Sequence, residues 1–236
     1  AAFFGRLDFV YEDYLEPRQR FELREGYAKI TLFDRLDLKI GRQIATWGTG
    51  DMVFVNDLFA KDYRSFFSGR DDQYLKAPQN ALRAELYTGL GGFTVVYTPR
   101  FTPNRVPTGE RLSYYDPLAG GIVGGGDVLF EGRLPGAELG NGEAAVRFSR
   151  YVRSLDVAVY FYRGFYKDPV AMDMATFEAY HPALQATGFS FRLPALGGIA
   201  WLEGGLYDSL DDDGGNDPAV PNSSMLGLAG FELSLI

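Results

Sequence analysis

The sequence contains no cysteine and only one histidine, His181. The absence of cysteine excludes disulfides and thiolate metal sites. Hydrolytic chemistry would then depend on a serine–histidine pair or on paired carboxylates, and no serine in a nucleophile motif lies near His181. Phosphate loops, dinucleotide fingerprints and metal-ligand spacings are missing too. We therefore predict a protein that is not an enzyme and that binds no cofactor and no metal, with a serine–histidine lipase as the enzymatic alternative.

Long apolar runs are also missing, because no segment approaches the roughly 18 consecutive apolar residues that a membrane helix needs. Lysine and arginine number 23 against 31 aspartates and glutamates, which gives a formal net charge of −8. A nucleic-acid partner would require a basic face, so none is predicted. If this chain spans a bilayer, it must do so as a β-barrel.

Aromatic residues and glycine are abundant instead, with 19 Phe, 15 Tyr and 29 Gly among 236 residues. Side chains alternate with a period of two: Leu82, Ala84 and Leu86 share one face of a predicted strand, whereas Arg83 and Glu85 share the other. A β domain of this length folds as one unit, so residues 1–236 are predicted to be a single domain. About ten segments alternate in this way: residues 2–14, 20–33, 36–43, 81–90, 93–101, 143–151, 155–164, 184–193, 198–207 and 225–235.

The connectors between these segments sort into two kinds. Short turns at residues 34–35, 89–92, 152–154 and 194–197 alternate with long connectors at 48–78, 102–142, 165–182 and 208–222. A transmembrane barrel has short turns at one rim and long loops at the other. We expect no regular element in 102–142, which is rich in Gly and Pro, and a short helical turn near Ala171 to Ala179.

One face of each predicted strand is nearly uncharged, and the other carries Arg, Lys, Asp and Glu. In a soluble sheet the charged face would meet water and the apolar face a core. In a barrel the apolar face meets lipid, because a charged side chain in lipid costs about 2–4 kcal/mol at the midplane. Strand lengths near the 9–11 residues that cross a tilted bilayer, the sorted connectors and the aromatic residues at strand ends, such as Tyr151, Phe165 and Tyr207, favour the barrel.

The charged face would then line the lumen. Its residues either set the selectivity of a pore or only hold the wall together through cross-strand ion pairs. The predicted pore-lining residues are Arg6, Asp8, Glu12, Arg24, Asp37, Lys39, Arg83, Glu85, Arg100, Arg147, Asp156, Arg192 and Glu232.

Three stretches carry a family resemblance: LREGYAKI (residues 23–30), LDLKIGRQIATWG (36–48) and the run from Asn56 to Arg64 that contains AKDYR. Together they resemble Gram-negative outer-membrane porin-like barrels with a GRQ…WG element, neighbours of the alginate-export barrels. The resemblance covers about 45 residues and implies an antiparallel transmembrane barrel that passes or exports a solute, with no agreed substrate. A proline common in the family's loop is replaced here by Lys61.

The connector from Gly48 to Pro78 is too rich in aromatic and charged residues for a simple turn. It either folds into the lumen as a constriction or forms an extracellular cap held by its phenylalanines. As a constriction it would present Asp51, Asp57, Asp62, Arg64 and Arg70, together with Asn56, Lys61, Asp71 and Asp72. The acidic run from Asp211 to Asp217 has the composition of a calcium loop but lacks its spacing and closing glutamate, so we interpret it as a solvated loop.

These patterns predict an outer-membrane porin or exporter that passes small polar or anionic solutes through a mixed-charge lumen. Its partners would be outer-membrane lipid and a small polar solute, with a partner protein or a homo-oligomer left open. The alternatives are a plugged barrel that acts as a surface anchor or binding protein, and a soluble β ligand-binding domain. The first residue is not Met and the last strand ends on Ile236 rather than on an aromatic residue, so we expect a processed form or a fragment of a longer barrel.

Overall fold

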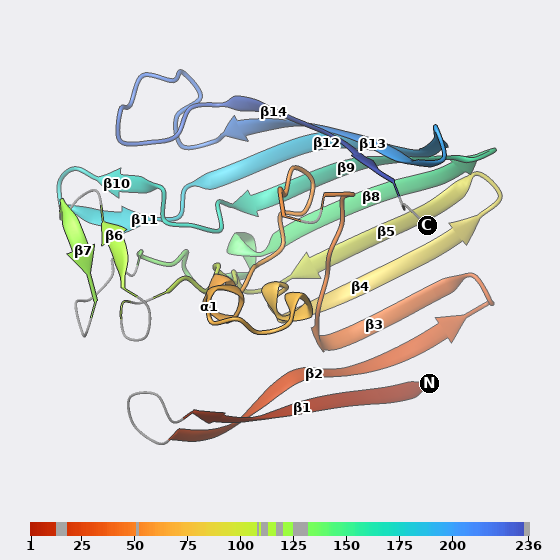
Figure 1. Ribbon diagram of the computed structural model, residues 1–236, viewed down its shortest axis with the longest axis horizontal. Coiled ribbons are helices and arrows are strands. Elements are labelled where there is room, and N and C mark those ends of the chain that lie inside the picture. Colours follow the sequence, from red (N-terminus) through yellow and green to blue (C-terminus); the bar gives the residue numbers. More distant parts are fainter. Residues whose placement is uncertain are drawn as a thin grey trace.

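The computed structural model describes residues 1–12, 18–50, 52–107, 109, 113–116, 120–124 and 132–233. Ten antiparallel strands form one sheet whose spatial order follows the chain (Figure 1). The prediction of an all-β antiparallel fold is confirmed. The strands are β1 (Ala2–Glu12), β2 (Arg18–Leu32), β3 (Leu36–Gln43), β4 (Gln79–Thr88), β5 (Gly91–Thr98), β8 (Glu143–Val152), β9 (Leu155–Phe165), β12 (Ala183–Ala195), β13 (Gly198–Ser209) and β14 (Ser224–Glu232).

Tight turns close the hairpins at one end of the sheet. Phe33 and Asp34 have φ of 54° and 55° between β2 and β3, and the Arg35 amide donates to the Leu32 carbonyl at 3.2 Å. Leu196 and Gly197 have φ of 51° and 81° between β12 and β13. Positive φ at both central residues gives the turn a twist that matches the flanking strands. This end therefore carries the short connectors.

The sheet is not closed. Its ladder ends at β1 and β14, which lie at opposite edges (Figure 1). The structure therefore shows an open, ten-stranded sheet, and the closed transmembrane barrel stays a prediction. Among the described residues no helix is long and apolar enough to cross a membrane.

The two faces of the sheet differ as the alternation predicts. On the outer face the apolar side chains are exposed, for example Leu82 (41 %), Val95 (43 %) and Val159 (49 %). On the inner face small residues are buried beneath connector residues: Ala81, Ala145, Ala158 and Ala186.

A bulge in β2 changes one predicted orientation. Arg6 of β1 pairs with Glu25 and Leu7 pairs with Leu23, so Arg24 is the extra residue. Alternation over residues 20–33 predicts that Tyr27 shares a face with Leu23. Instead Tyr27 lies on the inner face, where the centre of its ring is 3.6 Å from Nζ of Lys39. Strict alternation fails here because a bulge shifts the phase by one residue.

The long connectors contain short elements of their own. The connector 44–78 holds α1 (Tyr63–Phe67) and the 3-10 helix η1 (Asp72–Leu75), and the 3-10 helix η2 covers Leu139–Asn141. The connector 102–142, expected to be irregular, contains the hairpin of β6 (Tyr114–Asp116) and β7 (Gly121–Val123).

The helical turn predicted near residues 171–179 is wrong, because this stretch is a hairpin of β10 (Ala171–Asp173) and β11 (Glu178–Tyr180). The Asp173 carboxylate accepts hydrogen bonds from the Ala175 and Thr176 amides. An aspartate that bonds its own following backbone favours a turn over a helix.

Candidate functional site

The candidate site is the connector of residues 44–78, here called the plug, where it meets the inner face of the sheet. The plug leaves the sheet at Gln43 and returns at Gln79, which are register partners. Figure 1 shows α1 and the rest of the plug in front of the sheet rather than beyond its rim. The connector therefore lies against the inner face of the sheet, and its predicted role as a constriction stays a prediction.

Aromatic side chains anchor the plug in the middle of the sheet. Trp47 contacts Phe59 with ring centroids 4.9 Å apart and Tyr160 of β9 at 5.9 Å. Both plug residues join the buried cluster that includes Ala145 and Ala186. The space left beside them is about 10 Å³, which is at most one water molecule. The small inner-face residues thus leave room that the plug fills completely.

The Glu203 carboxylate of β13 holds the first part of the plug. It accepts hydrogen bonds from the Thr49 amide, the Thr49 hydroxyl (2.7 Å), the Gly50 amide (3.0 Å) and the Asn56 side-chain amide (3.0 Å). Glu203 is 1 % exposed, so this carboxylate is satisfied by the plug rather than by water. Charge-assisted hydrogen bonds of this kind are about twice as strong as neutral ones.

Glycine on β12 makes this contact possible. A Cβ at Gly188 would lie 1.9 Å from Oδ1 of Asn56 and 2.7 Å from the Gly204 carbonyl. The Asn56 side chain also donates to the Phe189 carbonyl at 3.0 Å, and Tyr207 donates to the Val55 carbonyl at 2.8 Å. Tyr207, predicted at an aromatic strand end, therefore points inward against the plug.

The GRQ…WG residues build the start of the plug. Gly41 has a φ of 129°, and a Cβ there would lie 2.4 Å from the Gly26 carbonyl. Gln43 is fully buried and donates to the Ala81 carbonyl at 2.8 Å. Gly48 has a φ of 82° and lies directly beside the Glu203 carboxylate. These positions explain why the motif needs glycine at both ends.

A buried charge cluster lies at the centre of the plug. Oδ2 of Asp57 accepts hydrogen bonds from the Thr46 hydroxyl at 2.7 Å and from Lys76 at 2.8 Å. Oδ1 of Asp57 lies 3.0 Å from Nζ of Lys61. Lys61 also donates to the Phe59 carbonyl at 2.6 Å. Burial lowers the pKa of Lys61 to about 8, with Asp57 opposing this shift and Lys76 adding to it. One carboxylate therefore serves two ammonium groups.

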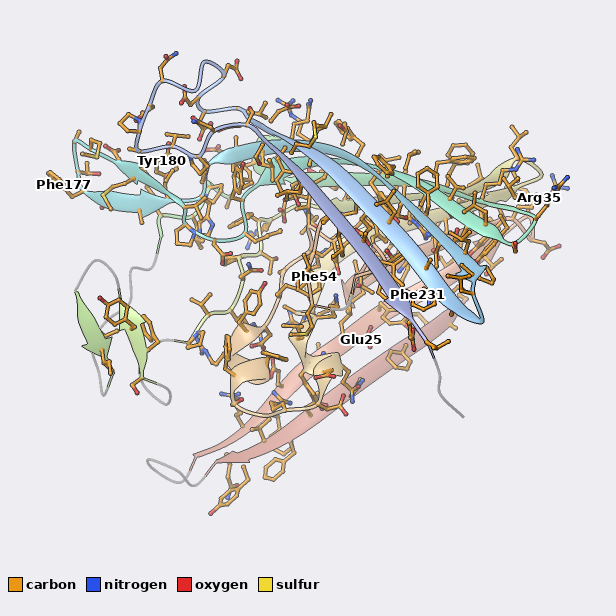
Figure 2. The ribbon with its side chains drawn as sticks, turned by 45° about the horizontal axis from the view of Figure 1, so that its top comes forward. Glu25, Arg35, Phe54, Phe177, Tyr180 and Phe231 are labelled. Carbon is orange, nitrogen blue, oxygen red and sulfur yellow. The ribbon has the colours of Figure 1, made fainter. Side chains whose placement is uncertain are left out.

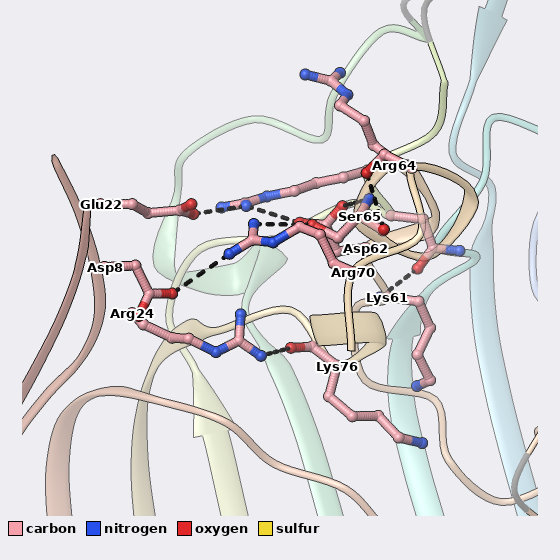
Figure 3. Close-up of polar contacts among 12 residues, drawn as sticks. Asp8, Glu22, Arg24, Lys61, Asp62, Arg64, Ser65, Arg70 and Lys76 are labelled. Atoms are coloured by element: carbon pink, nitrogen blue, oxygen red, sulfur yellow. Dashed lines mark hydrogen bonds and ion pairs between the residues drawn. The ribbon is translucent and has the colours of Figure 1, made fainter. Parts of the chain in front are cut away.

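Arginines tie the other side of the plug to β1 and β2 (Figure 3). Arg24 donates to the carbonyls of Gln73 at 2.6 Å and Lys76 at 3.1 Å. Arg70 pairs with Asp8 at 3.6 Å. Arg105, from the next long connector, lies 2.8 Å from Glu22 and 3.1 Å from Asp62.

The long connectors are anchored by a second buried group. Lys167 pairs with Glu143 at 2.5 Å and donates to the Thr102 carbonyl at 3.2 Å. Tyr162 donates to the same Glu143 oxygen at 2.5 Å. Burial lowers the pKa of Lys167, which Glu143 opposes.

Toward the tight turns the inner face carries the remaining predicted pore-lining residues. Lys29 pairs with Asp37 at 2.8 Å and Arg83 with Glu85 at 2.6 Å. The Arg147 guanidinium lies 5.9 Å from the centre of the Tyr160 ring. Asp156 and Arg192 are register partners on β9 and β12. Arg6 donates to Gln73 of the plug at 3.0 Å.

Five predicted residues are not part of this group. Arg100 is exposed beyond the end of β5, and Glu232 is exposed in the last position of β14. Arg64 lies in α1 and donates weakly to the Val106 carbonyl at 3.4 Å, so it faces the next connector. Asp51 and the side chain of Glu12 lie outside the described residues.

The prediction missed Glu203, Glu143 and Lys167. Glu203 lies on the polar side of a correctly predicted strand and was identifiable from alternation. Lys167 stands in an irregular connector, where periodicity gives no signal. Asn56 was named for the constriction, but its contact with Gly188 was not visible in the sequence.

His181 packs among the long connectors. Its Nδ1 lies 2.9 Å from the Tyr166 carbonyl, its ring lies 4.8 Å from that of Phe101 at an angle of 59°, and burial lowers its pKa. In the described part of the chain no three His, Asp or Glu residues come close enough to hold a metal ion.

Comparison of the chain with protein-family models, with curated proteins and with solved structures gives no match. The resemblance to porin-like barrels therefore stays a prediction.

Proposed function

We propose that the sheet is the wall of a transmembrane β-barrel in the Gram-negative outer membrane, and that the plug narrows a lumen through which small polar or anionic solutes pass. The observation that carries the proposal is the polarity of the two faces. Exposed aliphatic and aromatic side chains cover the outer face from β1 to β14, where Arg42 and Arg163 interrupt them near the long connectors, and most of the charged and buried polar groups lie on the inner face.

An outer face of this kind is unfavourable in water. Soluble monomers rarely expose a contiguous apolar patch of more than a few hundred Å². Here the exposed outer-face residues include Phe9, Leu86, Phe189, Leu202 and Met225, which come from strands across the whole width of the sheet. Lipid is the environment that suits them.

The proposal requires that both sheet edges be paired in the membrane. Unpaired backbone groups cost several kcal/mol each in a bilayer, so an open edge is not tolerated there. β1 and β14 would therefore pair with further strands. A lumen that holds the plug of residues 44–78 also needs a wall wider than small barrels provide, because eight strands leave room only for side chains.

The charges on the part of the inner face that the plug does not cover indicate which solutes would pass. Within the described residues, Lys39, Arg147 and Arg192 form no ion pair, and neither do Glu25 and Asp156. Unpaired charges of both signs favour hydrated polar solutes, and the cations favour those that carry a negative charge.

Planar-bilayer conductance tests the channel. A variant in which a two-residue turn replaces residues 44–78 keeps the Gln43–Gln79 pairing and should conduct several-fold more current than the wild type. A plug-containing variant, Leu90→Gln in the β4–β5 turn, is the control and should match the wild type. Absence of conductance in the plugless variant would contradict the proposal, as would extraction of the protein into buffer without detergent.

A second function is favoured by how completely the plug is held. The space of about 10 Å³ beside Trp47 and the four bonds to Glu203 suit a permanently plugged barrel that serves as a surface anchor or binding protein. A protein that inserts stably into bilayers but conducts only without its plug would support this second function.

A further inference from the structure

A separate cavity lies at the long-connector end of the molecule, away from the plug. It has a volume of about 490 Å³ and opens to solvent between the β10–β11 hairpin and the connector 208–222. The Met172 amide donates to the Ala219 carbonyl at 3.0 Å and joins the two segments. Figure 2 shows this hairpin, with Phe177 and Tyr180 labelled, projecting beyond the end of the sheet.

The cavity walls are apolar. Its lining includes Val170, Met172, Met174, Ala179, Pro218 and Ala219. Val170 and Met174 are 48 % and 61 % exposed, so apolar side chains remain uncovered at its mouth. Methionine adapts its shape to different ligands, and the volume lies in the range of small-molecule sites.

The two segments that form the cavity are acidic and contain no lysine or arginine. Residues 168–182 contain Asp168, Asp173 and Glu178, and residues 208–222 contain Asp208, Asp211, Asp212, Asp213 and Asp217. Most of the carboxylates that accept a hydrogen bond accept it from a neutral group, which leaves their charge in place. Asp211 accepts from the Ala183 amide, Asp212 from the Asn216 and Asp217 amides, and Asp217 from the Ala219 amide.

Asp173 and Glu178 are register partners that alternate with Met172 and Ala179, so they lie on the face of the hairpin opposite the cavity. There, in the described part of the chain, Arg133 lies 3.6 Å from both carboxylates, with its side chain 53 % exposed. These long, exposed contacts neutralise little of the surrounding charge. The pKa of Tyr180 is raised by burial and then by Asp211 and Asp217, which is the direction expected beside uncompensated carboxylates.

An inorganic cation does not fit this site, since no three carboxylates converge within the described residues. An apolar ligand without charge would make no use of the acidic rim. From the apolar walls and the acidic rim we infer that the cavity binds a small hydrophobic amine: an apolar body fills the space beside Met172 and Ala179, and an ammonium group lies at the rim near Asp217, whose carboxylate accepts from the amide of the lining residue Ala219.

A matched pair of probes tests this inference. 1-Aminoadamantane and adamantane-1-carboxylate have the same apolar body and opposite charges. They are titrated by calorimetry into the purified full chain in non-ionic detergent, with detergent alone as the blank. We expect the amine to bind at least tenfold more tightly than the carboxylate. Methylammonium, which lacks the apolar body, should not bind.

Variants locate the site. Ala179→Phe fills the cavity from the hairpin and Ala219→Leu fills it from the facing connector, so each should weaken amine binding more than tenfold. Asp217→Asn should weaken amine binding two- to fivefold and reduce the difference in affinity between the two probes. Leu90→Phe, at a 68 % exposed position in the β4–β5 turn, is the control and should leave binding unchanged.

Equal binding of the two probes would overturn the role of the acidic rim. No binding of the amine at millimolar concentration, or binding that both cavity-filling variants leave intact, would overturn the site itself. None of these results depends on conductance. The amine site can therefore fail its test while the proposed channel stands, and the channel can fail its test while the amine site stands.

Discussion

The plug is attached to the sheet on two sides that differ in chemistry. On β12 and β13 the attachment is buried and depends on one carboxylate, Glu203, with a glycine that admits Asn56. On β1 and β2 it depends on arginines: Arg24 is 3 % exposed, whereas the side chains of Arg70 and Arg105 are 25 % and 35 % accessible. Buried charge-assisted bonds are strong, whereas exposed ion pairs contribute about 0–1 kcal/mol each. The comparison teaches that the plug is fixed at β13 and at Arg24, and that the ion pair of Arg70 with β1 can loosen first.

The largest expected effect on plug docking comes from a substitution on β13. Glu203→Ala removes the acceptor for the Thr49 and Gly50 amides and for Asn56, and each buried donor left without a partner costs about 1–3 kcal/mol. We expect hydrogen exchange of the Thr49 and Gly50 amides to accelerate at least a hundredfold. Glu232→Ala, at an exposed carboxylate of the neighbouring strand, should leave both rates unchanged. Unaltered exchange in Glu203→Ala would show that the plug is held elsewhere.

The second prediction concerns pH. The pKa of Lys61 is about 8 in the docked plug and about 10.5 when the side chain is in water. The docked state therefore gains stability as pH rises from 8 to about 10.5, because the free plug still binds a proton that the docked plug has released. The gain is about 3 kcal/mol. Protection of the plug amides, corrected for intrinsic exchange, should rise over this range in the wild type and stay flat in Lys61→Met.

The glycine on β12 gives a smaller effect. Gly188→Ala places a methyl group against Asn56 and the Gly204 carbonyl, so Asn56 must move and lose its bond to Glu203. We expect the free energy of plug docking to fall by about 2 kcal/mol. Gly5→Ala is the matched control, because nothing lies within 4 Å of the added Cβ. Equal effects of the two substitutions would contradict the contact.

The smallest effect is expected on the side of β1 and β2. Arg70→Ala should weaken plug docking by less than about 1 kcal/mol, and 0.5 M salt should abolish the difference from the wild type because exposed charges are screened. Protease sensitivity of residues 68–76 at low and high salt measures this. A loss as large as that of Glu203→Ala would mean that the two sides are equivalent.

The sequence predicts the ten-stranded sheet better than it predicts the structure of the plug. Alternation places the ten strands and their tight turns, since a period of two and positive-φ turns depend on local residues. It fails at Arg24, where a bulge shifts the phase, and at residues 171–179, where Asp173 stabilises a turn. The plug depends on contacts between distant residues, such as Asn56 with Gly188 and Glu203, and no local pattern encodes a contact across more than a hundred residues.

Both ends of the plug are tethered to neighbouring strands at Gln43 and Gln79. A detached plug therefore stays near its binding surface at an effective concentration that short tethers place in the millimolar range. Its return requires no encounter with another molecule, and its rate is independent of how much protein is present. In the proposed channel, any opening by this segment would be brief and self-reversing, with a lifetime determined by how quickly the Glu203 bonds form again.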